Sequence, residues 1–192
     1  AYCHALKPGC FLVGECSGPT PIIAAYDRAR AQDSLFEFGL SRALFEAIHF
    51  EQPGILRAKF DELAREYEGR QTWSVFLANH DQERTLSQFD GDDTLARLAA
   101  ELEFVLPGTP FVYYGEEIGM TGRKPDEELR TPLPWNGRLP NGGFTREPGV
   151  PWHALHPDAV VHNVEDEARV SDSLLALYRR LIRLRLSQPT LR

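Results

Sequence analysis

Short apolar runs alternate with stretches of helical periodicity along most of the chain, a pattern typical of βα units and a parallel sheet. The apolar runs predict strands at residues 10–15, 34–40, 73–79 and 110–115. Apolar residues spaced three and four apart predict helices at about 44–50, 56–67 and 95–105. The pattern therefore predicts an α/β fold with about four βα units.

The helix expected at 95–105 has clear sequence signals at both ends. Asp92 and Asp93 are candidate N-caps, and the Pro-Gly pair at 107–108 ends the helical pattern. Its large apolar residues recur at helical spacing and predict one buried stripe, formed by Leu95, Leu98, Leu102 and Val105.

The segment from 119 to about 170 has a different composition. It is rich in Pro and Gly, yet it holds two of the three Trp residues, so it predicts a long, ordered loop. A C-terminal helix is expected at about 172–187, with Ser171 or Asp172 as its cap. We expect 1–192 to form one domain that includes this loop and this helix.

Polar side chains follow two of the expected strands where each strand ends. Glu15 ends the first, and Asn79, His80 and Asp81 end the third. In a (β/α)₈ barrel the catalytic groups sit at the carboxyl ends of the strands, and two carboxyl groups across a cleft are what glycoside cleavage requires. The same residues also fit a helix cap or an exposed surface group, and the spacing leaves both interpretations open.

The charge of the chain argues against some partners. Lys and Arg number 21 against 28 Asp and Glu, which gives 21 − 28 = −7, and no basic run occurs. We therefore expect no nucleic-acid partner and no anionic membrane partner. No apolar stretch approaches the ~20 residues that span a bilayer, and no signal-peptide pattern begins the chain. Because the chain starts without Met, we assign no localisation.

Three cysteines, Cys3, Cys10 and Cys16, lie in the first segment. An odd count cannot pair fully within one chain, and the spacings fit no usual zinc pattern, even with His4 nearby. We expect small buried or half-buried thiols, and we assign neither a metal nor a cofactor.

Three segments carry a family resemblance. FLVGE, FLANHD and LPGTPFVYYGEEIGM resemble, in this order, the second half of the catalytic barrel of the α-amylase family, glycoside hydrolase family thirteen. The resemblance implies half of a (β/α)₈ TIM barrel. It also implies that Glu15 is the general acid/base, that His80 binds substrate, and that Asp81 stabilises the transition state.

The segment RTPLPW, residues 130–135, is similar to a signature of family members that act on short α-glucans. By this resemblance Arg130 and Trp135 line a sugar subsite through hydrogen bonding and stacking. An alternative is that both residues only hold the long loop in place.

The neighbours of each site residue bear on its chemistry. A general acid at neutral pH needs an apolar environment, and the apolar residues 11–13 before Glu15 predict desolvation of its carboxyl group. Asp81 has to stay ionised, and we expect His80 and Arg84 to help. Glu116 and Glu117 are adjacent acids and therefore candidates for a second catalytic pair, but the resemblance implies a structural role for both.

The sequence departs from the family in one respect. Retaining members carry a nucleophilic Asp on a Gly-Phe-Arg-x-Asp motif, and this motif and the first four strands are absent from 1–192. Either the chain is part of a longer enzyme, or it is a half-barrel. A lone half-barrel would leave open sheet edges, so we expect it to form a homodimer that closes the barrel.

These features together predict a glycosidase that acts on oligosaccharides, an α-glucosidase or α-amylase type of retaining enzyme. Two alternatives stay open. The chain is a non-catalytic or partner half-barrel without the nucleophile, or a half-barrel dimer with a different sugar specificity, such as that of a galactosidase.

Overall fold

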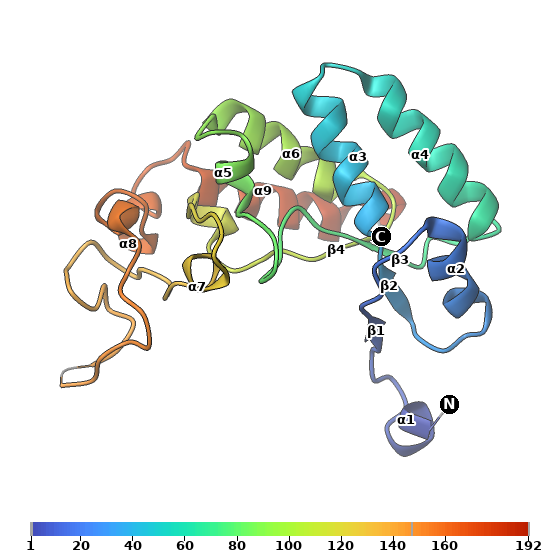
Figure 1. Ribbon diagram of the computed structural model, residues 1–192, viewed down its shortest axis with the longest axis horizontal. Coiled ribbons are helices and arrows are strands. Elements are labelled where there is room, and N and C mark those ends of the chain that lie inside the picture. Colours follow the sequence, from blue (N-terminus) through green and yellow to red (C-terminus); the bar gives the residue numbers. More distant parts are fainter. Residues whose placement is uncertain (1, 147, 192) are drawn as a thin grey trace. The chain divides into compact units, whose positions relative to one another are not determined.

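The protein, described by a computed structural model at residues 2–146 and 148–191, divides into two units (Figure 1). Unit 1 comprises Ala1–Phe76 and Leu106–Phe111. Unit 2 comprises Leu77–Val105 and Val112–Arg192. The chain thus leaves unit 1 after its third strand, returns for its fourth, and leaves again.

Unit 1 contains a sheet of four short parallel strands in the order β1-β2-β3-β4. They are β1 (Val13–Gly14), β2 (Ser34–Phe36), β3 (Trp73–Val75) and β4 (Thr109–Pro110). Val13 pairs with Ser34, and Leu35 pairs with Trp73. The predicted α/β fold with a parallel sheet is confirmed, and the strand order follows the order of the sequence.

The strands are shorter than the apolar runs that predicted them. The run at 34–40 was expected to be one strand, but β2 ends at Phe36 and α3 (Phe38–His49) begins two residues later. Leu40, Leu44 and Ile48 are buried at helical spacing, which is why residues 38–40 join the helix. β4 likewise ends at Pro110 rather than at Gly115.

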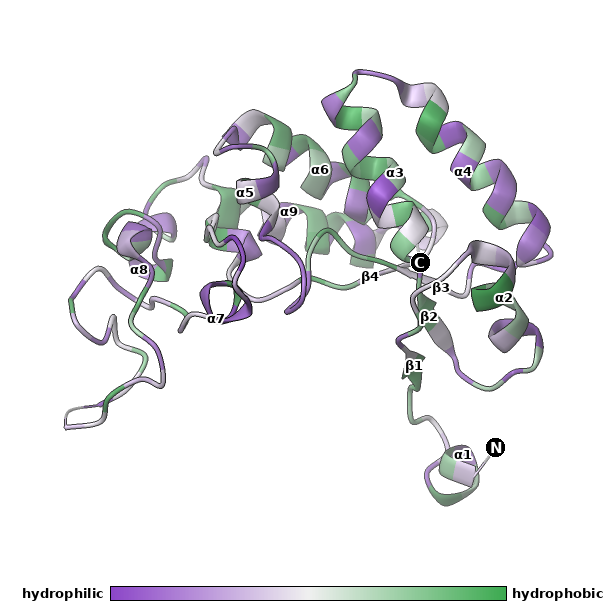
Figure 2. Ribbon diagram, viewed as in Figure 1, coloured by the Kyte–Doolittle hydropathy of each residue, from purple (hydrophilic) through white to green (hydrophobic). Residues whose placement is uncertain are grey.

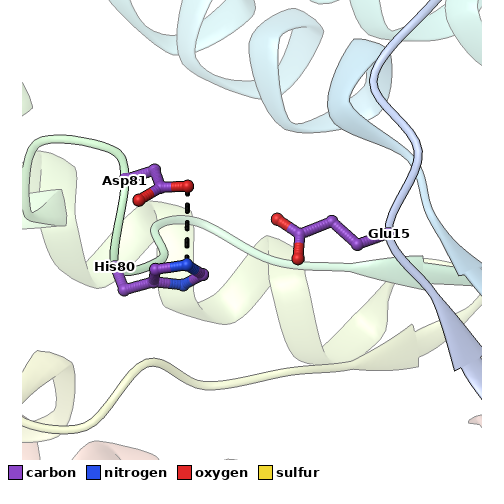
Figure 3. Close-up of side chains that lie close together, drawn as sticks. All are labelled: Glu15, His80 and Asp81. Atoms are coloured by element: carbon purple, nitrogen blue, oxygen red, sulfur yellow. Dashed lines mark ion pairs between the residues drawn. The ribbon is translucent and has the colours of Figure 1, made fainter.

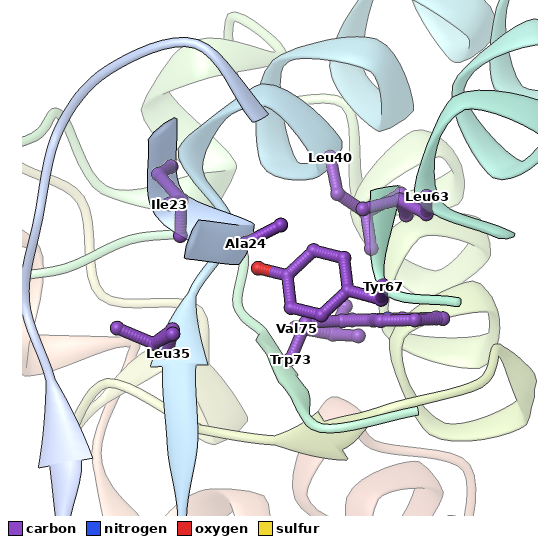
Figure 4. Close-up of a cluster of buried hydrophobic side chains, with 8 residues drawn as sticks. All are labelled: Ile23, Ala24, Leu35, Leu40, Leu63, Tyr67, Trp73 and Val75. Atoms are coloured by element: carbon purple, nitrogen blue, oxygen red, sulfur yellow. The ribbon is translucent and has the colours of Figure 1, made fainter. Parts of the chain in front are cut away.

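Three further helices of unit 1 are α1 (Tyr2–Leu6), α2 (Thr20–Arg28) and α4 (Pro53–Glu66). Hydrophilic and hydrophobic residues alternate along α4 (Figure 2), as expected of a helix with one apolar face. The buried core combines residues from helices and strands (Figure 4), namely Ile23, Ala24, Leu35, Leu40, Leu63, Tyr67, Trp73 and Val75.

Gly108 is required where the chain re-enters unit 1. Its φ is +115°, and a Cβ there would lie 2.6 Å from the Trp73 ring. The indole Nε1 of Trp73 donates a hydrogen bond of 2.7 Å to the carbonyl of Pro107. The Pro-Gly pair expected to end the preceding helix therefore also holds β4 against the core.

Unit 2 contains helices and loops. Its two long helices are α6 (Asp93–Val105) and α9 (Leu174–Ser187). The short helices are α5 (Thr85–Gln88), η1 (Glu116–Ile118), α7 (Asp126–Leu129), η2 (Pro157–Val160), α8 (Val164–Glu167) and η3 (Pro189–Leu191). The two long helices share a core made of Ala100, Phe104, Leu174, Leu177, Tyr178 and Leu181.

The buried face of α6 differs from the predicted stripe. Leu98 and Val105 are 42% and 41% exposed, so they do not belong to the core of unit 2. The buried residues are instead Ala96, Ala99, Ala100, Glu103 and Phe104. The prediction followed the largest side chains, whereas small alanines let the helix approach its neighbour closely.

The N-terminal ends of both long helices are capped. Asp92 Oδ1 accepts hydrogen bonds from the backbone N–H groups of Thr94 and Leu95, as expected of an N-cap. At α9 the expected caps, Ser171 and Asp172, are wrong by one or two positions. The hydroxyl of Ser173 accepts from the N–H of Ala176.

The cysteines differ in part from expectation. The three cysteines are free, and Cys3 is exposed rather than buried. Within the part of the chain that the structure describes, no helix combines the length and the apolar character needed to cross a bilayer.

Candidate active site

Glu15 follows β1 in unit 1. The preceding Gly14 lets β1 approach β2, because a Cβ at this position would lie 2.7 Å from Leu35 Cδ2. Glu15 is exposed, and so are Phe11 and Val13, at 56% and 38%. The expected desolvation of Glu15 by these apolar neighbours is therefore not found.

The strand β3 continues into a buried segment that leads to the polar triplet. Phe76, Leu77 and Ala78 are all at least 97% buried. The side chain of Asn79 then accepts a hydrogen bond of 2.9 Å from the N–H of Asp81, which closes a tight local turn. Asn79 thus has a structural role, and its hydrogen bond fixes the direction of the backbone at Asp81.

His80 and Asp81 form an ion pair in unit 2 (Figure 3). His80 Nε2 lies 3.4 Å from Asp81 Oδ2, and both side chains are about half exposed. The alternative that Asp81 caps a helix is wrong. The helix that follows, α5, begins at Thr85 with Arg84 in the cap position and no side-chain cap.

Arg130 completes this group from the start of the RTPLPW segment. Its Nη2 donates to Asp81 Oδ1 at 2.6 Å, and its Nε donates to the carbonyl of His80 at 2.9 Å. Nη2 also donates to Asp126 Oδ2 at 3.2 Å. Both carboxylate oxygens of Asp81 therefore face a nitrogen of another side chain, one from His80 and one from Arg130.

Arg84 has a different place from the one expected. It is 2% exposed, and its Nε and Nη2 have no hydrogen-bond partner among the described residues. Its guanidinium group lies 4.8 Å from the ring centroid of Tyr113 and 4.7 Å from that of Tyr114. Its Nη1 donates to the carbonyl of Tyr114 at 2.7 Å. Arg130, 49 positions from Asp81 in the sequence, takes the role expected of Arg84.

Trp135 also lies in unit 2. Its side chain is 51% exposed. Its backbone N–H donates to Gly142 at 2.7 Å, and its carbonyl accepts from Glu165 at 3.0 Å. These bonds tie the long loop together at Trp135, while the exposed indole ring stays accessible. The structure thus brings together His80, Asp81 and Arg130, and places Trp135 in the loop beyond them.

Unit 2 also contains two buried acids, Glu116 and Glu103. Glu116 accepts hydrogen bonds from the hydroxyls of Tyr178, at 2.6 Å, and Thr85, at 2.8 Å. Burial raises the pKa of Glu116 to about 7, although these two hydrogen bonds oppose the shift. Glu103 is fully buried, and burial followed by the charge of Glu116 raises its pKa well above the usual range. The expected apolar stripe of this helix does not include Glu103, and an acidic residue at helical spacing gives no signal of burial.

The described residues of each unit, taken alone, contain no group of three side chains suited to holding a metal ion. The chemistry within unit 2 rests on a carboxylate held by an arginine and a histidine. Such a group is pre-oriented to face positive charge, because little reorganisation is needed when that charge develops.

Comparison with known proteins identifies relatives. Alpha-amylase 3 of Dictyoglomus thermophilum is 32% identical over 190 residues, which cover 96% of this chain and 37% of that protein. The probable oligo-1,6-glucosidase 2 of Bacillus subtilis is 33% identical over 158 residues, which cover 60% of this chain and 28% of that protein. This chain therefore spans less than two fifths of the length of either relative.

Solved structures give the same result. The crystal structure of the alpha-amylase from H. orenii matches with a TM-score of 0.82 and 34% identity, over 97% of this chain and 38% of that one. The family model of the alpha-amylase catalytic domain matches residues 1–192. The resemblance carried by the three sequence segments is therefore confirmed. This chain belongs to the alpha-amylase catalytic-domain family of glycoside hydrolases.

Proposed function

We propose that this chain is part of a glycosidase that cleaves α-glucosidic bonds in oligosaccharides, with Glu15 as general acid/base and Asp81 as transition-state stabiliser. The observation that supports this most strongly is the Asp81 carboxylate, held by Arg130 at 2.6 Å and by His80 at 3.4 Å. Glu15 and the segment leading to Asp81 both follow strands of one parallel sheet, whose carboxyl ends share one edge.

Each residue has a role suited to its chemistry. Glu15 protonates the leaving oxygen and then removes a proton from the incoming water, since one carboxyl group can serve both steps. Asp81 faces the oxocarbenium charge, and Arg130 and His80 fix its two oxygens. His80 and Arg130 also offer N–H groups to sugar hydroxyls, and the exposed Trp135 ring offers a stacking surface.

The nucleophile of a retaining mechanism is assigned to no residue of this chain, because 1–192 lacks the Gly-Phe-Arg-x-Asp motif. The proposal therefore concerns the protein that contains this chain together with the residues that complete its site. The relatives' greater length is consistent with this, since the chain covers 37% of Alpha-amylase 3 of Dictyoglomus thermophilum.

The test measures how fast the complete protein turns over two substrates. Glu15→Gln should lower turnover of an oligosaccharide, which has a poor leaving group, by ~10²–10⁴-fold, because that step needs general acid catalysis. An aryl α-glucoside with an activated leaving group should lose much less. Equal activity of variant and parent on both substrates would overturn the assignment of Glu15.

Two other functions remain as competing proposals, and one panel of substrates separates them. A non-catalytic partner subunit turns over no glycoside. A half-barrel enzyme with altered specificity, such as a galactosidase, turns over β-glucosides or galactosides instead of α-glucosides. Turnover of α-glucosides alone supports the principal proposal.

The assembly of the barrel is a separate proposal, in which two copies of this chain close one eight-stranded barrel. It is favoured by the open sheet of unit 1, since β1 pairs only with β2 and β4 only with β3 among the described residues. Sedimentation of the isolated chain tests it: a dimer supports closure between copies, and a folded monomer supports a segment of a longer hydrolase.

A further inference from the structure

Two tyrosine hydroxyls hold the backbone on either side of Arg130. Tyr113 donates to the carbonyl of Leu129 at 3.1 Å, and Tyr114 donates to the carbonyl of Thr131 at 2.7 Å. Leu129 and Thr131 are both 0% exposed. Arg130 therefore projects from a backbone that is fixed on both sides, which restricts the directions its side chain can take.

The two tyrosine rings are themselves held by Arg84. Its buried guanidinium group contacts the faces of both rings and donates to the carbonyl of Tyr114. The next residue, Gly115, has φ +82°, and a Cβ there would lie 2.2 Å from Met120 Sδ. The turn after Tyr114 is thus closely packed, and the rings have little freedom to move.

The Tyr113 hydroxyl is suited to act as a lasting donor. Burial raises the pKa of Tyr113 to about 12, so its hydroxyl keeps its proton across the working range of most enzymes. Tyr114 is 38% exposed, but its hydroxyl donates over a short distance to a fully buried residue. Neither hydroxyl is needed for the ring contacts with Arg84.

These contacts form a closed path. Arg84 lies three positions after Asp81 and holds the two rings, the rings hold the backbone around Arg130, and Arg130 returns to Asp81 and His80. A second acceptor competes for Arg130, because Asp126 Oδ2 lies 3.2 Å from its Nη2. If the backbone around Arg130 shifted, the guanidinium group could move from Asp81 toward Asp126.

We infer that Tyr114, assisted by Tyr113, is a positioning residue that keeps Arg130 on Asp81 and so fixes the carboxylate proposed to stabilise the transition state. The inference rests on the proposed function for its catalytic meaning. Its structural content, that the hydroxyl controls the Arg130 side chain, stands on the hydrogen bonds alone.

The kinetic test uses Tyr114→Phe in the complete protein, which removes the hydroxyl and keeps the ring. We expect kcat on an oligosaccharide to fall about threefold to tenfold with KM unchanged, because the carboxylate acts in the transition state. In the Arg130→Gln background the same substitution should change kcat by less than about twofold, since the residue through which it acts is gone. Tyr26→Phe, at a tyrosine 50% exposed in unit 1, is the matched control and should leave kcat unchanged.

A second measurement separates this inference from the proposed function. The Arg130 Nε–H signal in an NMR spectrum should shift, and its hydrogen exchange should accelerate, in Tyr114→Phe compared with the parent. An unchanged signal, or an equal fall of kcat in both Arg130 backgrounds, would overturn the inference. Absence of any glycoside turnover by the parent would overturn the proposed function and leave the NMR result to decide the positioning role.

Discussion

Unit 1 and unit 2 each contain a glutamate with no exposed surface, and the two differ in what surrounds the carboxyl group. Glu37 of unit 1 lies among one cation and two hydroxyl donors. Glu103 of unit 2 lies beside a second acid, Glu116. A buried charge has to be paired or neutralised, and the two units of this chain meet that need in different ways.

In unit 1 the compensation is ionic. Lys59 Nζ lies 3.2 Å from Glu37 Oε1, the Thr20 hydroxyl donates to the same oxygen at 2.8 Å, and the Tyr67 hydroxyl donates to Oε2 at 3.1 Å. Burial, followed by the charge of Glu37, raises the pKa of Tyr67, which keeps this donor protonated. Because the partners come from α2, from α4 and from the residue after α4, the carboxylate joins the helices around the core.

In unit 2 the compensation is a proton. Among the described residues no N–H group or hydroxyl bonds either carboxyl oxygen of Glu103, and its hydrogen-bonding neighbour is a second acid, Glu116. Glu116 accepts from Tyr178 and Thr85, and the nearby charges of Glu117 and Arg84 act on it in opposite directions. Arg185 opposes the rise in the pKa of Glu103 but does not outweigh burial. Protonation thus removes a buried charge that Arg185 offsets only in part.

Removal of the cation in unit 1 should have the largest effect. Lys59→Met leaves the Glu37 charge buried without its counter-ion, so the free energy of unfolding of unit 1 should fall by about 3–5 kcal/mol. Hydrogen exchange of the α3 and α4 amides, recorded at increasing urea concentrations, measures this free energy of unfolding. Arg57→Met, at an exposed position of α4, is the matched control and should change stability by less than about 0.5 kcal/mol. Similar effects of both substitutions would contradict the ionic account.

The pH dependence of unit 2 is the next largest effect. The folded-state pKa of Glu116, about 7, lies above its usual value of 4.5, so the folded state binds more protons than the unfolded state between these values. Its contribution is complete below pH 4.5 and is lost as the pH rises through 7, by roughly 3 kcal/mol in total. Exchange of the α6 and α9 amides from pH 4.5 to 8 should show decreasing stability. A rise over this range would reverse the expected sign.

A single substitution tests the same account, and the change it should cause in the free energy of unfolding is smaller. Glu103→Gln resembles the protonated acid in shape and cannot ionise, so unit 2 should gain about 1–2 kcal/mol at pH 8 and change little at pH 5. Glu101→Gln, at an exposed position of the same helix, provides the matched control and should leave the pH profile unchanged. The idea fails if both variants follow the parent's profile.

The sequence predicted those parts of the fold that depend on local periodicity. The parallel βα order and the helices α4, α6 and α9 follow from spacing and capping signals within one segment. Strand ends were predicted less well, because Phe38 and Leu40 are as apolar in a helix as in a strand. The buried face of α6 was wrong because alanine gives little signal in a pattern of large side chains.

The candidate site shows the same division. Glu15, His80 and Asp81 could be named from short motifs, whereas the Arg130–Asp81 pair joins positions 49 apart and no local pattern reports it. Arg84 was expected to pair with Asp81 because it lies nearby in sequence, but its cation instead contacts two tyrosine rings. Contacts between distant segments depend on the packed structure, and a single sequence does not contain them as a pattern.

The pairing of α6 with α9 has a consequence for the order of folding during synthesis. Unit 1 has its last segment, Leu106–Phe111, long before α9 (Leu174–Ser187) leaves the ribosome. At ~5–20 residues per second this interval lasts roughly 4–15 s. During it, α6 is already made but lacks the helix that packs against Ala100 and Phe104. The α6 surface of the nascent chain is therefore open to chaperones during this interval, and the arrival of α9 is what lets unit 2 close.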